Sequence, residues 1–229
     1  MIVIYPTEGL CNKLRVVFSY NQFAQSHNQK LLVIWNRTHK CNGIFLNCFK
    51  PVDNILFMKK YDIKYKMNYI GYSRHQDFYP DYTKLQILPY LQKIVDEKRK
   101  ILGDKYIAVH IRRTDHVNLA KMSKRYTSDE EFTDFLKKNE GVNIYLATDN
   151  RTTQNKYMKL FPKRIKATKL IDEKNKNLRK TSMKDAVIDL FTCVHADKFM
   201  GSDWSSYSGL INNLRKTKLI LWIFSGSNK

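Results

Sequence analysis

The segment Tyr106-Ile-Ala-Val-His-Ile-Arg-Arg-Thr-Asp115 joins a mostly apolar stretch directly to a group of charged residues. Its first six residues predict a strand buried on both faces. Because side chains alternate faces along a strand, His110 and Arg112 are expected to point one way and Arg113 the other. A guanidinium is costly to bury unless an anion meets it. The strand end is therefore either a phosphate-binding site or a place where the arginines pair with Asp115 or lie in water.

The rest of the chain alternates between strand and helix patterns. Strands are expected over residues 2–5, 31–35, 106–111, 143–147, 164–167, 197–200 and 218–223, and helices over 10–27, 85–100, 128–138, 152–160, 182–195 and 206–215. Residues 36–81 show no regular pattern. Alternation of this kind predicts an α/β protein with parallel sheets. We expect two Rossmann-like lobes, residues 1–100 and residues 101–229, with a cleft between them.

The composition indicates a folded protein, because 43% of the 229 residues are hydrophobic and 13% are aromatic. The formal charge of +20 invites a nucleic-acid hypothesis. The basic residues are scattered, however, and no expected helix carries an organised basic face. We interpret most of them as solvated surface and expect no nucleic-acid partner. No apolar run has membrane-spanning length.

Four cysteines, at positions 11, 41, 48 and 193, lack the spacing of a zinc site. They predict free thiols in a reducing compartment, and a bridge between Cys41 and Cys48 is the alternative. The first residues lead directly into an expected strand, without the pattern of a signal peptide. We therefore expect a cytoplasmic protein.

The first strand is followed by the loop Thr7-Glu-Gly-Leu-Cys-Asn-Lys-Leu-Arg15, which begins a helix. Gly9 lets the backbone come close to a ligand, and amides at a helix start favour an anion. The alternative is an ordinary turn in which Glu8 and Asn12 are helix-start residues.

The strand over residues 143–147 ends in Ala147-Thr-Asp-Asn150. Ligands collect at the carboxyl ends of strands in such sheets. The carboxylate of Asp149 suits a guanine edge or a ribose, because it can accept two hydrogen bonds. Alternatively, Thr148 or Asp149 caps the helix that follows.

The strand over residues 197–200 ends in Gly201-Ser-Asp-Trp-Ser-Ser-Tyr-Ser-Gly209, and a helix follows. The hydroxyl groups of Ser205, Ser206 and Ser208 at a helix N-terminus suit a diphosphate. Plain helix capping also explains them. Together with the other loops, four polar segments are predicted at the strand ends of one α/β chain.

These segments resemble the motifs of a known family. His110-Ile-Arg-Arg-Thr-Asp115 resembles the HxRRxD signature of the GDP-fucose-dependent fucosyltransferases that form α-1,2, α-1,6 and protein O-linked products. Gly9-Leu-Cys-Asn-Lys-Leu-Arg15 is similar to their G-x-x-N loop, and Ala147-Thr-Asp149 to their ATD motif. Asp197-Lys-Phe-Met-Gly-Ser-Asp-Trp-Ser-Ser-Tyr-Ser208 resembles their third motif. The four motifs occur in the family's order and cover nearly the whole chain.

The resemblance implies a GT-B architecture in which the C-terminal lobe holds most of the GDP. Arg112 would bind the β-phosphate, and His110 with Asp149 would hold the guanosine. The full donor-binding set that it implies is Gly9, Asn12, His110, Arg112, Thr148, Asp149, Ser205, Ser206 and Tyr207.

The resemblance also implies an inverting enzyme that needs neither a metal nor a cofactor besides its GDP-fucose donor, and the chain contains no Asp-x-Asp triplet. Arg112 would stabilise the leaving GDP, and the acceptor would be a glycan or a protein. Glu8 replaces the first glycine of the N-terminal motif and is either the catalytic base or a helix-start acid; Asp115 is the second candidate base. The alternatives are another nucleotide-activated deoxyhexose as donor, or a binding protein that has lost catalysis.

Overall fold

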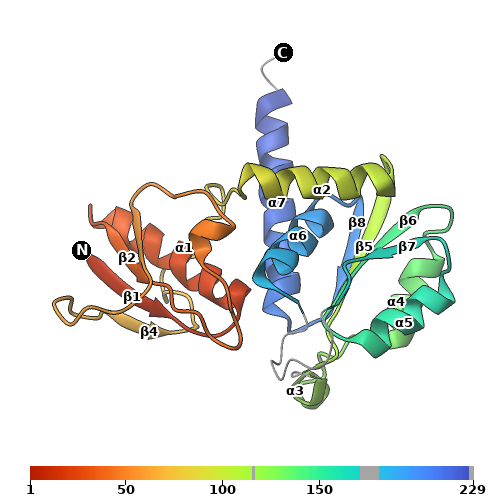
Figure 1. The fold of residues 1–229 in the computed structure, drawn as a ribbon, viewed down its shortest axis with the longest axis horizontal. Coiled ribbons are helices and arrows are strands. Elements are labelled where there is room, and N and C mark those ends of the chain that lie inside the picture. The colour runs from red at the N-terminus through yellow and green to blue at the C-terminus, as the bar shows by residue number, and fades with distance from the viewer. Residues whose placement is uncertain (115–116, 171–180, 227–229) are drawn as a thin grey trace. The chain divides into compact units, whose positions relative to one another are not determined.

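The computed structural model describes residues 1–114, 117–170 and 181–226, and it confirms an α/β protein with parallel sheets (Figure 1). The chain divides into two compact units, Met1–Leu88 and Pro89–Lys229. The sequence-based boundary at residue 100 lies inside helix α2 (Pro89–Leu102). This helix belongs to the second unit because it packs against helix α6 (Met183–Val194) of that unit.

The first unit contains a four-stranded parallel sheet in the order β3-β2-β1-β4. Its elements are β1 (Ile2–Pro6), α1 (Leu10–Ser26), β2 (Leu31–Ile34), a short 3-10 helix (Phe45–Asn47), β3 (Ile55–Met58) and β4 (Tyr69–Gly71). Strands β1 and β2 are apolar and almost wholly buried, as expected for inner strands of a parallel sheet. Strands β3 and β4 fall within residues 36–81, where no regular pattern was found. Both are edge strands, and Leu56 and Ile70 at their centres are exposed.

The second unit repeats this arrangement with the strand order β7-β6-β5-β8. Its strands are β5 (Tyr106–Ile111), β6 (Asn143–Thr148), β7 (Ile165–Ala167) and β8 (Lys198–Gly201). Its remaining helices are α3 (Val117–Met122), α4 (Asp129–Lys137), α5 (Arg151–Leu160) and α7 (Ser206–Gly226). The chain proceeds from β5 to β6 on one side and places β8 on the other side, so the strand order reverses between β5 and β8. In doubly wound sheets, ligands bind at this switch point.

Helices cover both faces of the second sheet, as Figure 1 shows. Phe132 of α4 and Tyr157 of α5 pack with Val109, Ile111 and Leu146 into one buried cluster. Helix α6 contacts strands β5 and β6. This packing fixes strand β5, whose six residues are all buried, at the centre of the unit.

The predicted strand over residues 218–223 is wrong, because helix α7 continues through this segment to Gly226. A short apolar run cannot be assigned to strand or helix by periodicity alone. No glycine or proline separates it from the helix that begins at Ser206, so the helix has no reason to stop. Helix α3 was also not predicted. Among the described residues, no helix is both long enough and apolar enough to span a bilayer.

A buried carboxylate links helix α6 to strand β6. Asp189 is 4% exposed, and its Oδ1 atom accepts a hydrogen bond of 2.6 Å from the Tyr145 hydroxyl and another from the Thr168 hydroxyl. Burial raises the pKa of Asp189 to about 6, because the charged form loses its water and the two hydroxyl groups offset this loss only in part.

This shift predicts a stability change with pH. The folded protein holds the Asp189 proton more tightly than the unfolded chain, whose carboxyl has the ordinary pKa of 3.8. The contribution of the protonated Asp189 carboxyl to the free energy of unfolding is therefore complete below pH 3.8 and is lost as the pH rises to about 6. We expect Asp189→Asn to remove it, so that wild type loses on the order of 2 kcal/mol more unfolding free energy than the variant across this window. Urea denaturation at a series of pH values measures the difference, and parallel curves would contradict the assignment.

Candidate functional site

The ends of β5 and β8 lie side by side at the switch point of the second sheet. His110 is paired in register with Gly201. Beyond these residues the Ser202 amide donates to the His110 carbonyl oxygen at 2.8 Å, and the Arg112 amide donates to the Ser202 hydroxyl at 2.9 Å. The two segments are thus joined past the last ladder positions, which fixes the backbone from which the Arg112 side chain extends.

His110 is buried at this edge, with 7% of its surface exposed. Its Nδ1 atom forms a hydrogen bond of 2.8 Å with the Ser208 hydroxyl of helix α7, and its ring lies 4.6 Å from the Tyr207 ring. The Tyr207 hydroxyl in turn donates to the carbonyl oxygen of Ala186 in α6 at 2.5 Å. The beginning of α7 is therefore attached both to strand β5 and to helix α6.

Gly201 makes this attachment possible. A Cβ atom at this position would lie 2.6 Å from the Cβ of Ser208 and would also overlap its hydroxyl oxygen. Any larger residue would push the first turn of α7 away from His110. The close approach, rather than an unusual backbone angle, is what requires glycine here.

Ser205 and Ser206 form the start of α7. Ser205 is buried, and its carbonyl oxygen accepts from the Gly209 amide at 2.9 Å, while its hydroxyl lies 3.5 Å from the Ser208 amide. Ser205 therefore occupies the cap position that the alternative interpretation assigned to it. Ser206 is half-buried in the first turn. Capping does not conflict with anion binding, because amides of the first helical turn have no partner within the helix.

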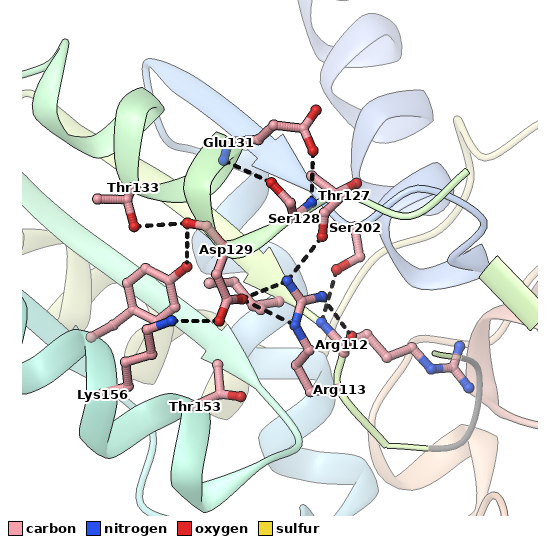
Figure 2. A network of polar contacts seen from close by, with 12 residues as sticks. Arg112, Arg113, Thr127, Ser128, Asp129, Glu131, Thr133, Thr153, Lys156 and Ser202 are labelled. Atoms are coloured by element: carbon pink, nitrogen blue, oxygen red, sulfur yellow. Dashed lines mark hydrogen bonds and ion pairs between the residues drawn. The ribbon is translucent and has the colours of Figure 1, made fainter. Parts of the chain in front are cut away.

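Arg113 has a structural role, because it forms an ion pair with Asp129 at the start of α4. Its guanidinium donates to Asp129 Oδ1 at 2.7 Å and to the Thr127 carbonyl oxygen at 2.9 Å, and its side chain is 11% exposed (Figure 2). Lys156 contacts the other oxygen of Asp129 at 2.6 Å. Burial tends to raise the pKa of Asp129, but hydrogen bonds from Lys156 and Arg113 outweigh it and lower the pKa below its ordinary value. The described partner of Arg113 is therefore Asp129, whereas the alternative partner Asp115 lies outside the described residues.

Arg112 extends away from this network (Figure 2). It is half-buried and lines a pocket in the second unit together with Arg125, Thr127, Ser202 and Trp204. Neither Arg125 nor Trp204 was predicted as a site residue from the sequence. Trp204 lies within the quoted third motif, whereas Arg125 follows a helix that the sequence pattern did not reveal.

Asp149 lies at the end of β6, next to β5. Its Oδ2 atom accepts from the Thr114 hydroxyl at 2.5 Å, and the Thr148 hydroxyl donates to the Ile111 carbonyl oxygen at 2.7 Å. The expectation that Thr148 or Asp149 caps α5 is wrong, because Asn150 accepts from the Thr153 amide at 2.8 Å and is the cap. Asp149 is thereby held beside the HxRR segment, while its contact with guanosine stays a prediction.

In the first unit, Glu8 and Gly9 occupy the turn between β1 and α1. Glu8 has a φ of 69°, a left-handed conformation that favours glycine, whereas Gly9 has an ordinary φ of −75° and is the N-cap of α1. The Glu8 carboxylate contacts Lys40 at 2.6 Å. Asn12 is half-buried in the first turn of α1. Asp115 lies outside the described residues.

The residue after Asn12 is a lysine that lies in the core of the first unit. Lys13 is fully buried, its Nζ donates to the Asn36 carbonyl oxygen at 2.5 Å, and it lies 5.0 Å from the centre of the Trp35 ring. Burial lowers the pKa of Lys13. This lysine anchors the start of α1, which carries the motif residues. Within the described ranges, no group of three His, Cys, Asp or Glu side chains is placed to hold a metal ion.

The fold and the motif positions define a two-unit glycosyltransferase of the nucleotide-sugar-dependent kind. The sequence profile of the family described as GDP-fucose protein O-fucosyltransferase matches residues 11–218. The chain belongs to this family and is a fucosyltransferase. Among curated proteins, none matches the sequence significantly.

Solved structures support the same fold. Fucosyltransferase NodZ from Bradyrhizobium superimposes with a TM-score of 0.65 at 12% sequence identity, covering 93% of this chain and 92% of that chain. POFUT1 in complex with GDP-fucose gives a TM-score of 0.62 at 11% identity, with 93% and 94% covered. POFUT1 in complex with GDP gives 0.62 at 12% identity, with 93% and 94% covered. The predicted GT-B-like architecture is thus confirmed.

Two glycine substitutions test the close approach at the switch point. We expect Gly201→Ala to lower the free energy of unfolding by about 1–3 kcal/mol, because the added Cβ overlaps Ser208. In the matched control Gly209→Ala, the new Cβ meets no atom within 4 Å and lies in helix α7, so stability should stay the same or rise by about 0.5–1 kcal/mol. Urea denaturation of both variants measures the effect, and equal stabilities would show that Gly201 is not required.

Proposed function

We propose that this protein transfers fucose from GDP-fucose to a hydroxyl group of a glycan or protein acceptor, with inversion at the anomeric carbon and without a metal ion. Membership of the family supports the donor. The observation that carries the proposal is the switch point: the HxRR strand end and the serine-rich start of α7 are joined there by the hydrogen bond between His110 and Ser208. This brings one arginine and one helix N-terminus to the same sheet edge, where a diphosphate is bound in such folds.

In the proposed reaction, the acceptor hydroxyl attacks the anomeric carbon from the face opposite the diphosphate. The bond from that carbon to the β-phosphate oxygen breaks, and negative charge develops on the departing GDP. Hydrogen bonds hold the Arg112 backbone and the start of α7 in place before the reaction begins, and such preorganised groups usually supply the largest part of the rate enhancement. They take the place that a metal ion would otherwise have, which supports a metal-independent mechanism.

We assign the remaining donor contacts to the second unit. His110 with Thr148 and Asp149 would hold the guanosine, and Ser205, Ser206 and Tyr207 would complete the phosphate site. The Tyr207 hydroxyl already donates to Ala186, so this residue would contribute its backbone amide and its ring.

The acceptor proton requires a base, and we propose Glu8 first and Asp115 second. The left-handed backbone of Glu8 supports its role as the base, because strained conformations cluster at functional sites. Its ion pair with Lys40 holds the carboxylate in one direction, and both side chains remain 34% exposed. We also propose a cytoplasmic location, in which the four buried cysteines would stay reduced.

We expect Arg112→Ala to lower kcat by about 10²–10³, because one preorganised donor to the leaving group is lost. The measurement is transfer of labelled fucose from GDP-fucose to a panel of glycans and peptides. The control is Arg99→Ala, which removes an arginine of α2 that is paired with Asp96 and 40% exposed.

A folded Arg112→Ala protein with near wild-type turnover would refute the assignment. Calorimetric titration of the wild type with GDP, GDP-fucose, GDP-mannose and UDP tests the donor at the same time. Preference for UDP, or no binding of any of them, would contradict the proposed donor.

We expect Glu8→Gln to lower kcat by about 10²–10⁴ while GDP affinity stays unchanged, because the amide cannot accept the acceptor proton. Asp62→Asn is the matched control, since Asp62 is also paired with a lysine in the first unit and is similarly exposed. Equal kcat values for Glu8→Gln and the control would exclude Glu8 as the base and leave Asp115.

A further inference from the structure

The turn between β8 and α7 presents an aromatic side chain in an unusual way. Trp204 has a φ of 54°, and 52% of its surface is exposed. A left-handed backbone is a clear outlier for a bulky residue, because its Cβ crowds the carbonyl oxygen. Neither burial nor backbone preference explains a tryptophan here.

Hydrogen bonds of the two residues before Trp204 hold the turn in this conformation. The Ser202 amide donates to the His110 carbonyl oxygen at 2.8 Å, and the Ser202 hydroxyl accepts from the Arg112 amide at 2.9 Å. The Asp203 amide donates to the Thr127 hydroxyl at 2.9 Å. Strained residues persist only where their surroundings fix them, and they are concentrated at ligand sites.

The surroundings of the indole combine an apolar ring with positive charge. Trp204 lines the same pocket as Arg112 and Arg125, and the Arg125 guanidinium lies 5.9 Å from the indole centre. This separation is at the limit of a cation–π contact. Arg125 thus lies close enough to restrain the ring, while Arg112 brings the positive charge that a diphosphate needs.

A nucleotide sugar matches both properties of this pocket. Its sugar is joined to the β-phosphate through a single oxygen, so a phosphate held by Arg112 places the sugar beside the residues that surround Arg112, and Trp204 is one of them. A deoxyhexose has apolar C–H groups and a methyl group that gain by contact with an aromatic face, while a charged phosphate does not. Arg112 therefore suits the charged part of such a ligand, and the adjacent Trp204 suits its apolar part.

We propose that Trp204 is the specificity-determining residue against which the transferred sugar packs, and that Arg125 is a positioning residue for its ring. The inference rests on the proposed function, because it requires Arg112 to hold the diphosphate. In the proposed complex only the sugar contacts the indole, so the affinity for GDP alone should not depend on Trp204.

The test uses Trp204→Asn and Trp204→Phe. Asparagine tolerates the left-handed backbone, so the first variant removes the ring without adding strain. Phenylalanine keeps an aromatic face. Calorimetry with GDP and with GDP-fucose is carried out on both variants and the wild type. We expect Trp204→Asn to weaken GDP-fucose binding roughly tenfold and GDP binding less than twofold, and Trp204→Phe to retain most of the GDP-fucose affinity.

Tyr90→Asn is the matched control, because Tyr90 is a partly exposed aromatic residue of the same unit with Lys184 located 5.2 Å from its ring. It should change neither affinity. Equal losses for GDP and GDP-fucose in Trp204→Asn, no loss for either, or equal losses in the Asn and Phe variants would overturn the inference alone. A wild-type protein that binds neither ligand would overturn the proposed function and the inference with it.

Discussion

The contact between His110 and Ser208 is the constraint on which the geometry of the second unit's sheet edge depends. It joins a buried imidazole of the central strand to the first turn of α7 at 2.8 Å, and it requires that position 201 carry no side chain. An unsatisfied buried polar group costs about 1–3 kcal/mol, so this bond strongly favours one position of the helix. The direction of the α7 amides, the bond that the Arg112 amide donates to the Ser202 hydroxyl and the turn that carries Trp204 all follow from that position.

The strands β5 to β8 and the helices α4 to α6 lie within one residue of their predicted bounds. Strand β5 has the predicted bounds, because an unbroken run of apolar residues is typical of an inner parallel strand. Strands β3 and β4 had no such signal, since each is an edge strand with exposed apolar residues. The run over residues 218–223 has the composition of a strand but continues a helix, and only the absence of a breaking residue before it distinguishes the two.

The candidate site was predictable where topology alone brings residues together. His110, Asp149 and the serines of α7 lie at the carboxyl ends of parallel strands, which meet at one edge of a sheet. Partners chosen by packing were not predictable. Arg113 pairs with Asp129 because α4 begins beside the end of β5, and Asn150, rather than either residue before it, caps α5. The left-handed backbone of Glu8 and Trp204 likewise leaves no mark in a single sequence.

The two adjacent arginines of the HxRR segment divide two tasks between them. Arg113 and Lys156 share the one carboxylate of Asp129, so this network carries two positive charges against one negative charge and remains net positive. The Arg112 side chain extends away from this network (Figure 2). Arg112 and Arg125 add further positive charge in the pocket beside Trp204. The attraction for an anion at this edge therefore comes from a few placed residues, and the chain's overall charge of +20 is not needed to explain it.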